Sequence, residues 1–327
     1  MLELELYNSQ QRRYNGISGS FSHPVFQAIQ KAGISAISWT FFTTQARDTA
    51  MTEWLANKTV VITGGSSGIG YAAAKKLLEV GATVHIIDIQ PLAKNHAPYP
   101  TTGEVYMHIP VDLGSREQVH KAFEDIFKIS PDVYGIVNTA GSAPADDKGK
   151  LIESDEVYHK TFATNTLGCY HATTEFLAHV RDRSQPLAAD APVTDTKYNI
   201  VTVGSSAALV GFPQSCVYTG AKHAVLGFTR TWAIDWAPYG VRSNMVAPGA
   251  TNTPLARIQM PVKEEEFNDE IYGKQTRGDI MDFARLKVPL KRWGEATELA
   301  DAIIFLLSER SSFITGQVLP VNGGWPP

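Results

Sequence analysis

The segment Thr63-Gly64-Gly65-Ser66-Ser67-Gly68-Ile69-Gly70 stands between a β-branched run, Thr59–Thr63, and an apolar helical pattern from about Ile69 to Val80. The run predicts a buried strand and the pattern predicts a helix, so a glycine-rich turn leads into a helix N-terminus. Backbone N–H groups and the helix dipole favour phosphate at that point. Three glycines leave room for the turn, the phosphates and the helix–strand contact: Gly64, Gly68 and Gly70. We therefore predict a dinucleotide site here rather than an ordinary turn, formed by Gly64, Ser66, Ser67, Gly68, Ile69 and Gly70.

Asp88 stands at the end of the next predicted strand, Thr83–Ile87, and follows Gly70 by 18 residues. A carboxylate at this place accepts hydrogen bonds from both ribose hydroxyls in the adenosine half of a dinucleotide. It also repels a 2′-phosphate, and Ser66 and Ser67 supply no cation to offset that repulsion. The sequence therefore favours NAD(H) over NADP(H), while a strand-end cap is the other interpretation of Asp88.

Short β-branched runs alternate with longer helical patterns after the first 57 residues. The predicted strands cover residues 59–63, 83–87, 105–111, 133–138, 199–203, 241–246 and 317–321. The predicted helices cover about residues 69–80, 115–129, 154–180, 216–236 and 295–307. This alternation is typical of βαβ units, so we predict an α/β fold. It consists of a single Rossmann-type, doubly wound parallel sheet of about seven strands with helices on both faces.

Residues 51–327 contain no linker or internal repeat, and we predict one Rossmann-fold domain that holds both the cofactor and the substrate sites. Residues 1–50 are interpreted as a poorly defined N-terminal extension, or as an upstream start ahead of Met51. A secretory signal needs a basic start and a continuous apolar core, and this segment has neither. Arg12-Arg13 fits a mitochondrial leader and the early glutamates do not. Organellar targeting therefore stays open beside the cytoplasm, which is the expected location.

The chain has 327 residues, a formal net charge of −4, 43% hydrophobic residues and 19% charged residues, which is typical of a soluble globular protein. No long basic run is present, so we expect no nucleic-acid partner. The apolar stretches are too short for a membrane span, and we expect no membrane partner. Cys169 and Cys216 do not make a disulfide framework or a metal cluster, so we expect a reducing compartment and no metal. We interpret Cys216 as a buried structural thiol.

Two connections are long, Arg181–Lys197 and Thr253–Lys287. The plain interpretation of each is a solvated surface insertion. The second also stands where a lid over a pocket is expected, so both interpretations of it stay open.

Tyr218 and Lys222 stand at i and i+4 near the start of a predicted helix, so their side chains share one face. A phenol with its ordinary pKa of about 10 is a poor base near neutral pH, and a neighbouring ammonium lowers such a pKa. The pair therefore suits proton transfer, whereas an amphipathic helix surface is the ordinary interpretation of this spacing. Ser205, Asn138 and Pro248-Gly249 follow other predicted strands, and ligands of open parallel sheets bind beyond such carboxyl ends. We expect all of these residues at one edge of one sheet.

Together these residues resemble the short-chain dehydrogenase/reductase family, over about residues 55–324. The resemblance rests on Thr63-Gly-x-x-x-Gly-x-Gly70, Asp112 in Val-Asp-Leu, Asn138-Thr-Ala-Gly141, Asn165, Ser205, Tyr218-x-x-x-Lys222, Pro248-Gly249 with Thr251 and Thr253, Gly316, and Asn322-Gly-Gly324. The glycine spacing is similar to that of the shorter oxidoreductases of the family and differs from that of the sugar-nucleotide epimerases. Two positions depart from the family pattern. Thr139 replaces the second Asn of Asn-Asn-Ala-Gly, and Asn322 replaces the Asp of Asp-Gly-Gly.

The resemblance implies a role for each matching residue. Tyr218 is the acid/base that exchanges a proton with the alcohol, and Ser205 hydrogen-bonds the substrate oxygen, with Ser206 as the rival for that serine role. Lys222 binds the nicotinamide ribose and activates Tyr218, while Asn165 holds a water that connects Lys222 to solvent. The implied catalytic set is Asn165, Ser205, Tyr218 and Lys222. The implied cofactor contacts beyond the glycine-rich turn and Asp88 are Asp112, Leu113, Asn138, Ala140, Gly141, Tyr218, Lys222, Pro248, Gly249, Thr251 and Thr253.

These residues predict an NAD(H)-dependent oxidoreductase that interconverts a secondary alcohol and a ketone by hydride transfer, with Tyr218 as the acid/base. One alternative is an NADP(H)-dependent ketoreductase, which Asp88 disfavours. The other is a catalytically silent dinucleotide-binding regulatory protein, which has no need of Ser205 beside Tyr218.

Several of the candidate residues for the walls of the substrate pocket are apolar, which favours an apolar substrate. These candidate residues are Ser142, Ala143, Ala207–Phe212, Ser215, Cys216 and Thr253–Met260. The resemblance also implies a homodimer or homotetramer that forms through the helices predicted at 154–180 and 216–236.

Overall fold

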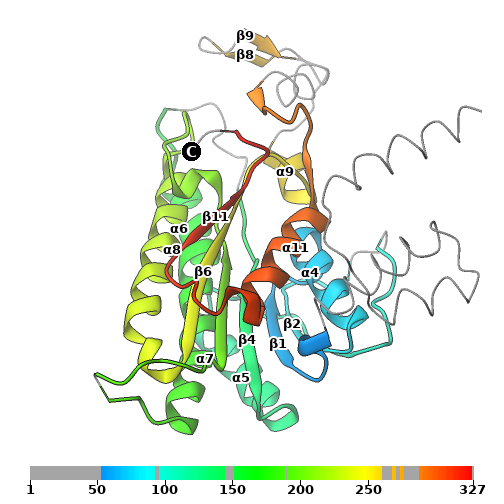
Figure 1. Cartoon of the computed structure of the whole chain (residues 1–327). Helices are drawn as coiled ribbons and strands as arrows, with labels where there is room; N and C mark the ends of the chain where they lie inside the picture. Colours follow the sequence, from blue (N-terminus) through cyan, green and yellow to red (C-terminus); the bar gives the residue numbers. More distant parts are fainter. Residues whose placement is uncertain are drawn as a thin grey trace, which may run out of the picture. The chain divides into compact units, whose positions relative to one another are not determined.

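The computed structural model describes residues 53–92, 96–143, 151–188, 190–259, 267–269, 273–275 and 287–325. Seven strands form one parallel sheet in the order β11-β6-β5-β4-β1-β2-β3 (Figure 1). They are β1 (Thr59–Thr63), β2 (Thr83–Ile87), β3 (Glu104–His108), β4 (Val133–Asn138), β5 (Tyr198–Val203), β6 (Val241–Pro248) and β11 (Val318–Val321). The strand order reverses between β1 and β4, which is the switch point of a doubly wound sheet.

The described helices around the sheet differ in how their first N–H groups are satisfied. They are α4 (Gly68–Glu79), α5 (Arg116–Ile129), α6 (Asp155–Phe162), α7 (Gly168–Arg183), α8 (Cys216–Asp235), α9 (Pro254–Gln259) and α11 (Ala296–Leu307). The side chains of Ser115 and Ser154 accept hydrogen bonds from the first turns of α5 and α6. Glu295 and Glu298 form a capping box at the start of α11.

Successive strand residues point to opposite faces of the sheet and enter two separate cores. In β1, Val60 and Ile62 belong to one core and Val61 belongs to the other. Helices α4 and α11 pack together over the first core, and α5, α7 and α8 cover the second (Figure 1). Because both faces are covered, the inner strands are buried along nearly their whole length. The predicted α/β fold is confirmed.

Two predicted elements differ from those in the structure. The helix predicted at 154–180 consists of α6, a π-helical turn at Ala163–Leu167, and α7, which continues to Arg183. A π-helical turn forms hydrogen bonds between residues i and i+5 instead of i and i+4, and no local propensity marks it. The strand predicted at 105–111 ends at His108. Pro110 has no N–H to donate to β2, so the ladder does not extend through it.

The long connection predicted as a surface insertion is described at residues 181–188 and 190–197, which start with the end of α7 and are otherwise irregular and largely exposed. Within the second long connection, the structure describes α9 and an antiparallel pair, β8 (Phe267–Asp269) and β9 (Gly273–Gln275). The remainder of the possible lid and the segment 1–50 lie outside the described residues. The described residues all belong to one compact unit. In the described part of the chain, no helix is long and apolar enough to cross a membrane.

Candidate cofactor and active site

The glycine-rich turn connects β1 to α4 along a backbone path that leaves no room for a side chain at Gly64 or Gly70. Gly64 has a φ of 72°, in the left-handed region that favours glycine, and a Cβ there would lie 2.6 Å from the Cα of Ala140. A Cβ on Gly70 would lie 2.2 Å from the carbonyl oxygen of Gly64. Ser67 is the N-cap of α4, and its side chain makes no capping bond, which leaves the helix N-terminus to an anion. This cradle fits the pyrophosphate of a dinucleotide.

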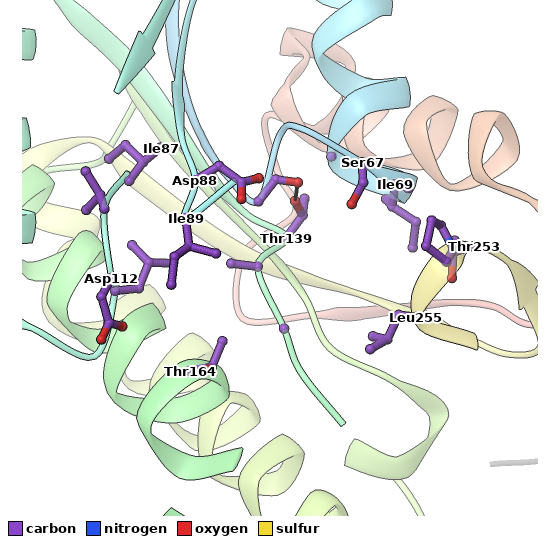
Figure 2. Close-up of a pocket in the computed structure, with 18 residues that line it drawn as sticks. Ser67, Ile69, Ile87, Asp88, Ile89, Asp112, Thr139, Thr164, Thr253 and Leu255 are labelled. Carbon is purple, nitrogen blue, oxygen red and sulfur yellow. Dashed lines mark hydrogen bonds between the residues drawn. The ribbon is translucent and has the colours of Figure 1, made fainter. Parts of the chain in front are cut away.

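A cavity of about 220 Å³ lies beside this turn (Figure 2). The predicted cofactor residues that line it are Gly64, Ser67, Gly68, Ile69, Gly70, Asp88, Asp112, Leu113, Ala140, Gly141 and Thr253. The predicted cofactor residues do not include the other lining residues, which are Ile87, Ile89, Val111, Thr139, Thr164, Pro254 and Leu255. Pro254 and Leu255 fall in the range Thr253–Met260 predicted for the substrate pocket, and the other five each adjoin a predicted site residue in the chain. Those five residues could therefore have been predicted by extending each motif by one residue on either side.

Other predicted cofactor residues do not line this cavity, namely Ser66, Asn138, Tyr218, Lys222, Pro248, Gly249 and Thr251. The side chains of Asn138 and Thr251 hydrogen-bond protein groups, as those of Ser66 and Lys222 also do. Asn138 Nδ2 donates a hydrogen bond of 2.9 Å to the buried Thr173 hydroxyl and so ties β4 to α7. Thr251 Oγ1 donates to the Gly249 carbonyl over 3.1 Å. The Asn138 and Thr251 side chains therefore stabilise the fold and do not line the cavity.

Asp88 lies on the cavity wall at the carboxyl end of β2 (Figure 2). Its Oδ2 accepts a hydrogen bond of 3.0 Å from the Ser66 N–H, and its Oδ1 accepts one of 3.0 Å from the Gln90 N–H. The carboxylate is therefore held in a fixed orientation beside the glycine-rich turn. A carboxylate has about four lone-pair positions, so two donors leave acceptor capacity for the hydroxyls of a ligand.

Lys222 lies one helical turn beyond Tyr218 in α8 and is buried, with 6% of its surface exposed. Its Nζ donates a hydrogen bond of 3.3 Å to the Val203 carbonyl and lies 5.7 Å from the centre of the Tyr218 ring. A Cβ on Gly141 would lie 3.7 Å from the same Nζ. Gly141 lines the cavity, so the ammonium lies close to the cavity wall.

Asn165 belongs to the π-helical turn between α6 and α7 and is buried. Its Oδ1 accepts a hydrogen bond of 2.7 Å from the Ser142 N–H, and its Nδ2 donates one of 2.8 Å to the Ser142 carbonyl. The side chain thus fixes the backbone that follows β4. A Cβ on Gly141 would lie 3.3 Å from Asn165 Oδ1, which places the amide beside the same glycine that adjoins Lys222.

The two rival serines after β5 differ in their surroundings. Ser206 is buried, and its hydroxyl donates a hydrogen bond of 3.1 Å to the Pro248 carbonyl. Ser205 is partly exposed, and its Oγ accepts a bond of 3.1 Å from the Ala207 N–H, which leaves its own proton available. The short 3-10 helix that Ser205 caps, Ser206–Ala208, packs against α8. The geometry therefore favours Ser205 over Ser206 as the group that meets a substrate.

Asp112 and Thr253 line the cavity and also cap local turns. Asp112 Oδ1 accepts a hydrogen bond of 2.8 Å from the Gly114 N–H. Thr253 Oγ1 accepts one of 3.2 Å from the Ala256 N–H at the start of α9. Both side chains thus have fixed positions on the cavity wall before any ligand arrives.

The cysteines take different environments. Cys169 is buried in α7, and burial raises the pKa of its thiol to about 11, so the thiol is unreactive. Cys216 is exposed, because it is the first residue of α8, and the expectation that it is buried is wrong. Among the described residues, no group of three or more His, Cys, Asp or Glu side chains is placed to hold a metal ion.

Comparison with known proteins places this architecture in a family. The family model described as Enoyl-(Acyl carrier protein) reductase matches residues 64–326. The chain is 31% identical to 2-(S)-hydroxypropyl-CoM dehydrogenase 3 of Xanthobacter autotrophicus, over 84% of this chain and 98% of that protein. It is 30% identical to 2,5-dichloro-2,5-cyclohexadiene-1,4-diol dehydrogenase of Sphingobium indicum, over 83% and 98%.

Solved structures give the same result. The ligand-free aldohexose dehydrogenase of Thermoplasma acidophilum superposes with a TM-score of 0.67 at 28% identity, over 84% of this chain and 96% of that one. The chain belongs to the short-chain dehydrogenase/reductase family, which binds a nicotinamide dinucleotide.

Proposed function

We propose that this chain is an NAD(H)-dependent oxidoreductase that interconverts a secondary alcohol and a ketone. The observation that carries the proposal is the position of Gly141. This residue lines the dinucleotide cavity, and its missing Cβ would lie within 3.7 Å of Lys222 Nζ and 3.3 Å of Asn165 Oδ1. The adjacency supports a common site for the dinucleotide and the proton-transfer pair, as reaction between a bound cofactor and a bound alcohol requires.

In the proposed reaction, the glycine-rich turn and Asp88 would hold the dinucleotide, which would supply the hydride acceptor for the alcohol or the hydride donor for the ketone. Tyr218 takes the alcohol proton in the oxidative direction and returns it in the reductive direction. Lys222 Nζ lies 5.7 Å from the centre of the Tyr218 ring, and a positive charge so placed favours the phenolate that forms. Ser205 directs its hydroxyl proton to the substrate oxygen and stabilises the charge that develops there. Asn165 holds the backbone after β4 and, in the family pattern, binds a water next to Lys222.

The proposed preference for NAD(H) rests on Asp88. Its carboxylate lies on the cavity wall, and the Ser66 and Gln90 N–H groups hold it in place. In this position it accepts hydrogen bonds from ribose hydroxyls and repels a 2′-phosphate. The NADP(H)-dependent ketoreductase remains the alternative that the cofactor titration below tests.

The proposed substrate is apolar. Phe212 and Trp325 form an edge-to-face pair with ring centres 5.2 Å apart, and both side chains are half-exposed. Phe212 follows β5 and Trp325 follows β11, and β6 lies between these strands in the sheet. The pair thus stands beyond the carboxyl ends of the strands, where ligands of such sheets bind. A cyclic alcohol suits an aromatic wall, and a relative named for a cyclohexadiene diol supports this choice.

We further propose a homodimer or homotetramer formed through α6, α7 and α8. The support is a set of large apolar side chains exposed on and between α6 and α7, namely Tyr158, Leu167 and Tyr170.

The cytoplasm remains the proposed compartment, because the two cysteines are free thiols. The proposed division is an extension at residues 1–50 and an oxidoreductase domain at residues 51–327.

The first test is a fluorescence titration of the purified chain with NADH and with NADPH. Wild type is expected to bind NADH at least about tenfold more tightly than NADPH. Asp88→Asn keeps the size of the side chain and removes its charge, so the NADH to NADPH preference should fall. Glu124→Gln, on the exposed face of α5, is the matched control. A wild-type preference for NADPH would establish the ketoreductase alternative.

The second test is turnover of a panel of secondary alcohols with NAD. Tyr218→Phe removes the phenol proton site and keeps the ring, so turnover should drop by about a hundredfold or more while NADH binding persists. Near-normal turnover of this variant would remove Tyr218 from the proposed role. Dinucleotide binding by wild type without turnover of any alcohol or ketone would favour the silent regulatory protein.

A further inference from the structure

Asp88, Gln90 and Tyr99, from the connection between β2 and β3, hold the glycine-rich turn at three points. The Tyr99 hydroxyl donates a hydrogen bond of 2.6 Å to the Gly65 carbonyl. The Ser66 N–H donates to Asp88 Oδ2 over 3.0 Å, and the Ser66 hydroxyl donates to the Gln90 carbonyl over 2.8 Å. Two consecutive residues of the turn, Gly65 and Ser66, are therefore fixed by side chains and backbone from a single segment.

Tyr99 is itself held in place. Its ring packs against Tyr71, the residue after Gly70, with ring centres 5.3 Å apart, and the Tyr71 ring also meets His96 at 4.4 Å. Burial raises the pKa of Tyr99 well above its ordinary value, so the hydroxyl keeps its proton and remains a donor to Gly65. On the other side of the turn, a Cβ on Gly65 would lie 2.8 Å from Ile86, so Gly65 packs directly on β2.

The turn needs such support because its own cap gives none. Ser67, the N-cap of α4, makes no side-chain hydrogen bond to the helix. The N–H groups that would meet a pyrophosphate follow directly after Ser66, so their direction depends on how Gly65 and Ser66 are held. A site whose donors are already aimed loses less conformational freedom when its ligand binds.

We propose that Tyr99 is a positioning residue for the dinucleotide, which acts by fixing Gly65 and thereby aiming the phosphate-binding turn. This inference rests on the proposed function, because it assumes that the cavity takes NAD(H). Tyr99 does not line the cavity, so its effect passes through Gly65 rather than through a contact with the cofactor. It predicts a loss of cofactor affinity without a loss of the chemical step.

The test is Tyr99→Phe, which keeps the ring against Tyr71 and deletes only the hydroxyl. The dissociation constant for NADH and the KM for NAD should rise about five- to twentyfold, as expected for one lost hydrogen bond in a preorganised site. The kcat at saturating NAD and alcohol should stay within about twofold of wild type, because the reacting groups are untouched. Ser66→Ala, which deletes the bond to Gln90, should raise the same two constants.

Tyr71→Phe is the matched control. It also deletes one phenol hydroxyl from this cluster, but that hydroxyl donates to the Ala97 carbonyl and not to the turn. Its NADH dissociation constant should stay near that of wild type. A Tyr99→Phe protein with a lower melting temperature and unchanged NADH affinity would overturn the proposal, since the bond would then be structural only. A lower kcat at unchanged KM would overturn it as well. Wild type that binds no dinucleotide at all would instead refute the proposed function, and the inference with it.

Discussion

The carboxylate of Glu153 accepts a hydrogen bond of 2.7 Å from the backbone N–H of Val217, the second residue of α8. Ser215, the N-cap of this helix, makes no capping bond with its own side chain. A carboxylate from a different part of the chain therefore takes the place of the local cap. Its negative charge also interacts favourably with the positive end of the helix dipole. The residue next to Val217 is Tyr218, so this contact bears on the acid/base group.

Removal of this cap should lower turnover. We expect Glu153→Ala to reduce kcat about three- to tenfold, because the first turn of α8 then frays and Tyr218 loses its fixed position. Glu153→Gln keeps an acceptor oxygen and should show a smaller loss. Steady-state kinetics with saturating NAD measures both. Glu156→Gln, which changes an exposed carboxylate of α6, is the control. An unchanged kcat in Glu153→Ala would contradict the prediction.

Loss of the aromatic wall should change substrate preference. Trp325→Ala removes one ring of the pair with Phe212, and kcat/KM for a cyclic alcohol such as cyclohexanol should fall about tenfold. A small acyclic alcohol such as 2-propanol gains little from this wall and should lose much less. The dissociation constant for NADH serves as the internal control. Equal losses for both alcohols would show that Trp325 does not select the substrate.

Arg242 should contribute strongly to stability. Its buried guanidinium donates hydrogen bonds to the carbonyls of Leu306, Ser308 and Ile314 at the end of α11 and beyond it. Burial lowers the pKa of Arg242, so the cost of burying the charge opposes these bonds. Arg242→Ala leaves the carbonyls without their donor and should lower the free energy of unfolding by about 3 kcal/mol. Urea denaturation measures this free energy of unfolding. Lys121→Ala, on the exposed face of α5, is the control and should change the free energy of unfolding by less than about 0.5 kcal/mol.

His85 should make stability depend on pH. The buried imidazole lies between His108 Nε2 at 3.0 Å and Ser130 Oγ at 2.9 Å, with the Tyr106 ring stacked on it. Burial, and then the neighbouring His108, lower the pKa of His85 from 6.5 to about 4. Between these two values the unfolded chain binds a proton that the folded chain does not. Stability should therefore be highest above pH 6.5 and fall as the pH approaches 4, by up to about 3 kcal/mol from this group.

Urea denaturation at several pH values from 7.5 down to 4.5 checks this prediction. His85→Gln cannot take up the proton, so its unfolding free energy should vary less with pH over the same range. His108 also has a lowered pKa, mainly through burial, and should leave a smaller residual slope. Identical slopes in wild type and His85→Gln would exclude His85 as the source.

The sequence predicts the sheet because strands that are buried on both faces consist of short apolar, β-branched runs, which are recognisable in the sequence. The strands Thr59–Thr63 and Thr83–Ile87 have the predicted bounds, since β-branched runs between turn residues specify them. The glycine-rich turn and Asp88 are predictable together for a related reason. Both follow neighbouring parallel strands, whose carboxyl ends necessarily meet at one edge of the sheet.

The sequence by itself determined the order of strands and helices, the phosphate turn and the spacing of Tyr218 and Lys222, because each depends on residues close together in the chain. Only the tertiary structure decided that Tyr99 meets Gly65 across 34 residues and that Glu153 caps α8 across 64. Only the tertiary structure, likewise, brings the Phe212 and Trp325 rings into contact. Local propensity sets backbone angles and the face on which a side chain lies, whereas contacts between distant segments depend on how the finished layers pack. The supports of the site therefore became visible only in the folded chain.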